Sequence, residues 1–102
     1  MAFHTALGLQ AGLDPADVEA IRQRRSPTDA KTAALSALAK ALIEKRGQVD
    51  EGELDAFLAG GFTQEQVLEV IAVSSASTIT NYVGSVTKPP LEEAFSPYGW
   101  TA

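Results

Sequence analysis

The sequence predicts an all-α fold: a packed bundle of about five helices in a single domain over residues 1–102. Apolar residues recur at helical spacing, and glycines and capping side chains divide the chain into successive segments. Apolar residues make up 45% and charged residues 21%, which is ordinary for a folded protein. Because a 102-residue domain buries only a modest share of its surface, we expect association with further copies to complete the bundle.

A glycine and a capping aspartate separate the first two predicted helices. Residues 3–11 keep an apolar face at three- and four-residue spacing and end at a glycine. Asp14 can cap the next helix and Pro15 suits its first position. That helix ends near Arg24 or Arg25, where positive charge suits the helix dipole better than it indicates phosphate binding.

The middle of the chain predicts a third and a fourth helix. From about Asp29 to Arg46 the sequence is rich in alanine, leucine and lysine and carries a broad apolar stripe. A short helix opens at Val49 or Asp50 and ends at the glycine pair 60–61.

The fifth predicted helix is the longest and the most apolar. Thr63 caps it, with Gln66 three residues later as in a capping box. Its β-branched content also permits a strand, but the length and the cap favour a helix. Apolar residues cover most of its circumference, so it is central or lies in a subunit interface. Two prolines end it, residues 91–95 form a short helical turn, and Tyr98 and Trp100 fold back on a neighbouring surface.

One stretch is repeated within the chain. Gly12-Leu13-Asp14 recurs as Gly61-Phe62-Thr63: a glycine ends one helix, an apolar residue plugs the turn, and a capping residue opens the next helix. We therefore expect two matched helix-turn-helix units in the chain. The alternative is convergence, because helix-ending glycines and capping residues are common at helix ends.

Composition excludes several partners and locations. With 13 acidic and 8 basic side chains the net charge is -5, so we expect no nucleic acid partner and no membrane partner. The start does not resemble a signal peptide, and no apolar run approaches the ~18 residues of a membrane span. We therefore expect a cytoplasmic protein.

Few side chains offer catalytic or ligand-binding chemistry. The chain has no cysteine and one histidine, His4, so we expect no metal site, and without a Gly-rich phosphate loop we expect no cofactor. By residue type alone, His4 fits a helix-end histidine satisfied by a hydrogen bond. Ser74, Ser75 and Ser77 would need a nearby base to act as nucleophiles, so small polar residues in a packed helix explain them better. Glu69 is a candidate functional acid in an apolar helix, but an exposed strip or an ion pair explains it better.

Six motifs follow one another along nearly the whole chain. They are Phe3-His4-Thr5-x-x-Gly8-x-x-x-Gly12-Leu13-Asp14, Val18-Glu19-Ala20-Ile21-Arg22, Ala34-Leu35, Val49-x-x-x-x-Leu54-x-Ala56-Phe57, Gly61-Phe62-Thr63-x-x-Gln66-Val67-Leu68-Glu69-Val70 and Thr80-Asn81-Tyr82-Val83. In this order the chain resembles the alkylhydroperoxidase D / carboxymuconolactone decarboxylase family, in its peroxidase-related branch.

The resemblance implies an all-α fold that assembles into homo-oligomers, from dimers to hexamers. It also implies an antioxidant oxidoreductase with peroxiredoxin activity on small hydroperoxides. In the thiol-active branch a Cys-x-x-Cys pair is followed by three residues and then a histidine. One thiolate attacks the peroxide, the second resolves the sulfenic acid, and the histidine relays protons with an upstream glutamate. His4 matches that catalytic histidine.

The chain departs from this pattern at its start, because the cysteine pair would fall immediately before Met1. We expect residues 1–102 to be the C-terminal portion of such a domain, Met1 to be an internal start, and this chain to be inactive. Two alternatives stay open. One is a cysteine-independent lactone decarboxylase that uses His4 with a carboxylate. The other is a non-catalytic oligomerising module whose fifth helix forms the subunit interface.

Overall fold

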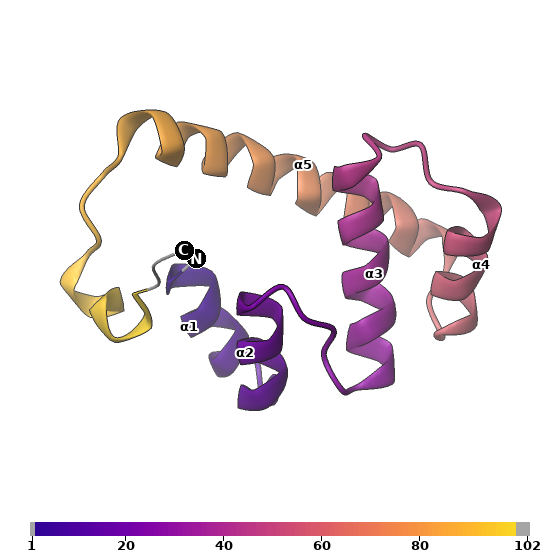
Figure 1. Cartoon of the computed structure of the whole chain (residues 1–102), viewed down its shortest axis with the longest axis horizontal. Helices are drawn as coiled ribbons and strands as arrows, with labels where there is room; N and C mark the ends of the chain where they lie inside the picture. Colours follow the sequence, from indigo (N-terminus) through magenta and orange to yellow (C-terminus); the bar gives the residue numbers. More distant parts are fainter. Residues whose placement is uncertain (1, 100–102) are drawn as a thin grey trace. The chain divides into compact units, whose positions relative to one another are not determined.

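The described part of the chain, residues 2–99 of a computed structural model, is helical and contains no strand (Figure 1). This confirms the all-α prediction. The elements are α1 (Ala2–Gln10), α2 (Pro15–Arg22), α3 (Ala30–Glu44), α4 (Glu51–Ala59), α5 (Gln64–Thr87) and a terminal 3₁₀ helix, η1 (Glu93–Tyr98). Trp100, predicted to fold back with the tail, lies outside the described residues.

The predicted caps open the helices. The Asp14 carboxylate accepts from the Ala16 backbone N–H at 2.8 Å, with Pro15 at the first helical position of α2. Thr63 and Gln66 form the expected capping box at the start of α5. A second capping box, between Asp50 and Glu53, opens α4. Each box satisfies backbone donors that the first helical turn leaves without an internal partner.

Two predicted helix ends lie two or three residues too late. α2 ends at Arg22 and α3 at Glu44, because the chain after each helix turns into a left-handed conformation. After α2, the Arg25 N–H returns to the Ala20 carbonyl at 2.8 Å. After α3, the Gly47 N–H returns to the Leu42 carbonyl, also at 2.8 Å. In each turn the returning N–H satisfies a carbonyl of the last helical turn, and the helix ends there.

The repeated sequence motif forms a similar helix-ending turn at both of its positions. Gly12 and Gly61 have φ of 89° and 96°, a region that favours glycine. The residue after each glycine folds back onto the helix just ended: Phe62 stacks on Phe57 with ring centroids 4.4 Å apart, and Leu13 lies against Gly8. The two turns therefore share a physical design as well as a sequence pattern.

The chain divides into two compact units. The first unit joins the residues up to 27 with those from 89 onward, so it contains α1, α2 and η1. The Phe95 ring meets the Phe3 ring edge-on at 5.4 Å, which fixes η1 against α1. The helical turn predicted at 91–95 forms slightly later, over Glu93–Tyr98. The buried residues of the three helices are Ala2, Thr5, Ala6, Asp17, Val18 and Ala20.

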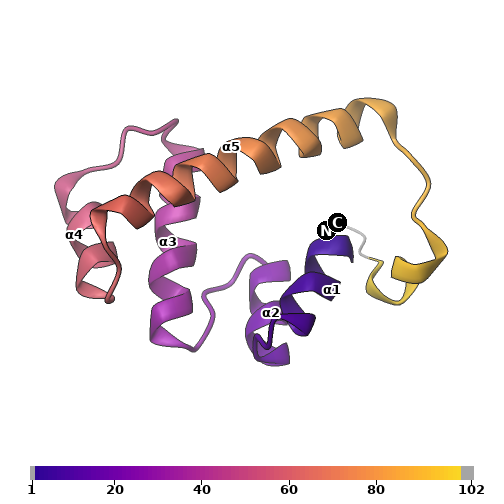
Figure 2. The ribbon, with the colours of Figure 1, turned by 180° about the vertical axis from the view of Figure 1, so that it is seen from behind.

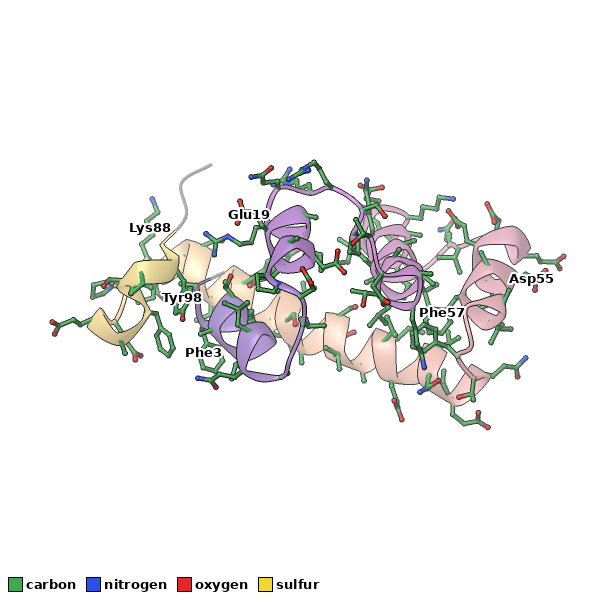
Figure 3. All side chains as sticks on the ribbon, turned by 90° about the horizontal axis from the view of Figure 1, so that it is seen from below. Phe3, Glu19, Asp55, Phe57, Lys88 and Tyr98 are labelled. Atoms are coloured by element: carbon green, nitrogen blue, oxygen red, sulfur yellow. The ribbon has the colours of Figure 1, made fainter. Side chains whose placement is uncertain are left out.

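The second unit comprises α3, α4 and α5, from residue 28 to residue 88. Phe57 points from α4 into the space between the helices (Figure 3) and is 1% exposed. It packs with Leu38 and Leu42 of α3, and further apolar side chains surround this core. These are Val49, Leu58, Phe62, Val67 and Val70. Full burial of a large apolar side chain such as Phe57 stabilises the fold by about 1.5–3 kcal/mol.

A cluster of opposite charges joins the end of α3 to the start of α4. The Lys45 Nζ lies 2.6 Å from Glu53 Oε1 and 3.5 Å from Asp50 Oδ2. The hydrogen bond from Lys45 lowers the pKa of Glu53, and the bond from the Glu53 backbone N–H lowers the pKa of Asp50. The hydrogen bond to Glu53 also raises the pKa of Lys45. The cluster therefore favours the charged form of all three groups.

Candidate functional site

His4 stands in the first turn of α1, where its side chain is exposed. Its ring meets the Phe3 ring edge-on, with centroids 5.5 Å apart. Among residues 2–99 no hydrogen bond to the imidazole is formed, so the hydrogen bond expected for a satisfied helix-end histidine does not occur. An exposed imidazole can exchange protons with solvent and with a bound molecule.

Arg22, in the last turn of α2, has a role that the sequence pattern did not indicate. Its Nη1 donates to Thr5 Oγ1 at 2.8 Å and to the Tyr98 carbonyl at 3.1 Å, and its Nη2 donates to the Gly99 carbonyl at 3.3 Å. It also pairs with Glu19 at 3.5 Å. The guanidinium thus joins α1, α2 and the end of η1, which agrees with a structural use and not with phosphate binding.

The three candidate serines all lie on α5, in the second unit, whereas His4 lies in the first. The Ser75 hydroxyl donates to the Ile71 carbonyl at 2.8 Å, which is the ordinary use of serine inside a helix. Ser74 and Ser77 are half-buried and offer their own carbonyls to the hydroxyls of Thr78 and Thr80. The hydroxyl of Ser75 is thus used within the helix, but Ser75 is exposed and no residue of α5 is fully buried, so the prediction of a packed helix does not hold at this position.

Glu69 is exposed and stands at the rim of an apolar groove. The groove encloses about 350 Å³ between α3, α4 and α5. Its lining residues are Leu35, Ala39, Phe57, Phe62, Gln66, Glu69, Val70, Val73 and Ser74. The exposed carboxylate fits the simpler prediction of a solvated strip on α5.

A second groove, which we call the arginine groove, lies between the C-terminal end of α3 and the middle of α5. It encloses about 380 Å³. Its lining residues are Leu42, Ile43, Arg46, Gly47, Ile71, Ser74, Ser75, Thr78 and Tyr82. Apolar side chains thus face a guanidinium and several hydroxyl groups.

α5 also presents an exposed apolar seam along its outer side. Ala72, Ala76, Ile79, Val83 and Val86 follow one another at alternating four- and three-residue steps, the spacing of a helix-pairing surface. The last three are 66%, 56% and 83% exposed. The C-terminal half of α5 extends beyond α3 (Figure 2), and no charged residue lies between 70 and 87. A helix with this pattern has an apolar face without a partner inside its own unit.

Residues 2–99 offer neither a metal centre nor a membrane span. No three side chains of the His, Cys, Asp and Glu types gather there closely enough to hold a metal ion. No helix in the same range combines the length and the apolar character needed to cross a bilayer. Comparison with known proteins gives no match to a family model and no match to a curated protein.

Proposed function

We propose that this chain is an alkylhydroperoxidase D / carboxymuconolactone decarboxylase-like helical module, related to thiol-dependent hydroperoxide reductases, with His4 in the proton-relay position. The observation that carries the proposal is the ordered set of motifs that begins at His4. The structure supports it in two respects: the chain is all-α, and the His4 side chain is exposed in the first turn of α1.

The proposed chemistry needs two thiols, and this sequence has none. A thiolate attacks one oxygen of a hydroperoxide, the O–O bond breaks, and the alcohol leaves after taking a proton. The resulting sulfenic acid condenses with the second thiol, which releases water and forms a disulfide that an external dithiol reduces. An exposed imidazole at His4 can supply the proton to the leaving alkoxide. Of the groups that this proposed chemistry needs, the 102-residue chain therefore supplies only the proton-relay histidine, His4.

The first test is an assay of peroxide reduction with an organic hydroperoxide and a dithiol donor. We expect no turnover by the 102-residue chain, because it has no thiolate. A longer product, extended by Cys-x-x-Cys immediately before Met1, should reduce the peroxide. Replacing His4 by Gln in that product should slow the reaction by about 10²-fold or more.

Three results would contradict the proposal: no turnover by the longer product, turnover by the cysteine-free chain, or an unchanged rate in the His4→Gln variant. A longer product with both cysteines replaced by serine is the matched control for the thiols. Turnover of carboxymuconolactone by the 102-residue chain would instead support the cysteine-independent lactone decarboxylase.

The seam on α5 favours a second role, assembly with another copy of the chain. A self-complementary apolar seam without charged residues can pair with itself even though the whole chain carries a net charge of -5. We therefore propose a homo-oligomer in which α5 of one copy lies against α5 of the next.

A further inference from the structure

The arginine groove carries an inference that is independent of the proposed peroxide chemistry. Its apolar wall comes from Leu42 of α3 and Ile71 of α5. Arg46, two residues beyond the end of α3, also lines the groove and is itself exposed. The groove therefore combines an apolar surface with one positive charge.

Arg46 is a cation without a counterion in the described part of the chain. The neighbouring Lys45 takes both nearby carboxylates, Asp50 and Glu53. No ion pair or hydrogen bond is formed by the Arg46 guanidinium among residues 2–99. The guanidinium is therefore available to an anionic group in the groove, with which it can form charge-assisted hydrogen bonds.

The hydroxyl groups of the groove differ in what they can donate. Ser75 and Thr78 donate to the carbonyls of Ile71 and Ser74, each at 2.8 Å, so they present only lone pairs to the groove. The Tyr82 hydroxyl makes no hydrogen bond within residues 2–99 and remains able to donate. Arg46 and Tyr82 are therefore the groups best suited to an anionic oxygen.

We propose that the arginine groove binds an amphiphilic carboxylate, with the carboxylate at Arg46 and its apolar chain along Leu42 and Ile71. A volume of about 380 Å³ lies within the usual range for small-molecule sites, about 300–1,000 Å³. A medium-length alkyl chain fills such a groove and leaves the carboxylate beside the guanidinium. Charge complementarity selects a carboxylate over a neutral molecule of the same length.

Octanoate is the probe for the test, with octanamide as its neutral counterpart of equal length and acetate as the head group alone. We expect octanoate titrated into the full chain to shift the backbone amide resonances of Leu42, Gly47 and Ile71. Octanamide and acetate should bind at least about tenfold more weakly, because each lacks one of the two interactions. Equal binding of octanoate and octanamide would overturn the proposal.

The decisive pair of variants is Arg46→Gly and Arg24→Gly. Both arginines lie two residues beyond the end of a helix and have positive φ, 53° and 58°, so glycine suits either backbone and both variants should fold. We expect Arg46→Gly to weaken octanoate binding about tenfold or more, while Arg24→Gly binds as the unaltered chain does. Tyr82→Phe should weaken it by a smaller factor. Unchanged binding in Arg46→Gly, or loss in Arg24→Gly, would refute the site.

Discussion

At the scale of single residues, three cations occupy a backbone conformation that usually belongs to glycine. Arg24 and Arg46 lie two residues beyond the ends of α2 and α3 and have φ of 58° and 53°; Lys88 directly follows α5 and has φ of 46°. A non-glycine residue in this region is strained by about 1–3 kcal/mol. A positive charge beside the last carbonyls of a helix offsets part of that cost. The sequence predicted positive charge at the end of α2, but it did not predict that a cation after each of three helices has a positive φ.

A contrast between two glycines shows what close packing demands. A Cβ on Gly60 would lie 2.8 Å from the Ala34 Cβ, although its φ of -71° suits any residue. We predict that Gly60→Ala lowers the free energy of unfolding by about 1–2 kcal/mol, because α3 and the end of α4 must move apart. Urea unfolding measures this change.

The matched control is Gly84→Ala on α5, where an added Cβ meets nothing within 4 Å. That variant should raise stability by about 0.5–1 kcal/mol through the better helix propensity of alanine. Equal effects of the two substitutions would show that the contact between Gly60 and Ala34 does not limit packing.

At the scale of elements, capping residues and charges fix the connection from α3 to α4. Asp50 and Glu53 satisfy the first turn of α4, and Lys45 at the end of α3 pairs with both. The same carboxylates therefore start one helix and connect it to the preceding one. The sequence predicted Asp50 as one possible start of α4. It did not predict that Lys45 pairs with Asp50 and Glu53, which is seen only in the folded structure.

The charge cluster makes the stability of the second unit depend on pH. The pKa values of Asp50 and Glu53 are lowered from their ordinary 3.8 and 4.5, so their contribution is present above these values and is lost as the pH falls below them. The pKa of Lys45 is raised from 10.5, so its contribution is present below 10.5 and is lost at higher pH. The full contribution therefore lies between about pH 4.5 and 10.5.

We predict that Glu53→Gln reduces the loss of stability between pH 7 and pH 3.5. The glutamine keeps the capping box but cannot form the ion pair with Lys45. Urea midpoints at the two pH values measure the effect. Glu51→Gln is the matched control, since Glu51 is an exposed acid of the same turn without an ion pair in the described residues. An unchanged pH dependence in Glu53→Gln would show that the pair contributes nothing measurable.

At the scale of the whole molecule, the chain is organised by contacts between segments far apart in sequence. The first unit takes residues from both ends of the chain, and Arg22 joins them through the carbonyls of Tyr98 and Gly99. The second unit holds its core at one end of α5 and leaves the rest of that helix with an apolar seam exposed. An apolar surface of this kind is usually covered by a partner.

The assembly proposal predicts that Val83→Glu, in the middle of the seam, shifts the chain from oligomer to monomer. Placing two carboxylates in a pairing surface costs several kcal/mol per pair. Sedimentation equilibrium at micromolar concentration measures the change. Asn81→Glu, an exposed position on the same helix outside the seam, should leave the oligomer intact. A monomeric unaltered chain, or equal effects of the two variants, would contradict assembly through α5.

The sequence by itself determined which segments are helical and where most of them start, because caps, glycine stops and helical periodicity act over a few residues. The Thr63–Gln66 box and the Gly12 and Gly61 stops are local structures of this kind. They depend on neighbouring backbone groups that the sequence places within reach.

Only the tertiary structure decided which long-range contacts the side chains make. It gave Arg22 its acceptors 76 and 77 residues away, placed the Phe57 ring in the core and left Arg46 without a counterion in the described residues. Such contacts depend on how helices pack, and helical spacing specifies the apolar face of a helix but not the neighbour that covers it. For the same reason the sequence placed His4 in the first turn of a helix, while its exposure was a result of the fold.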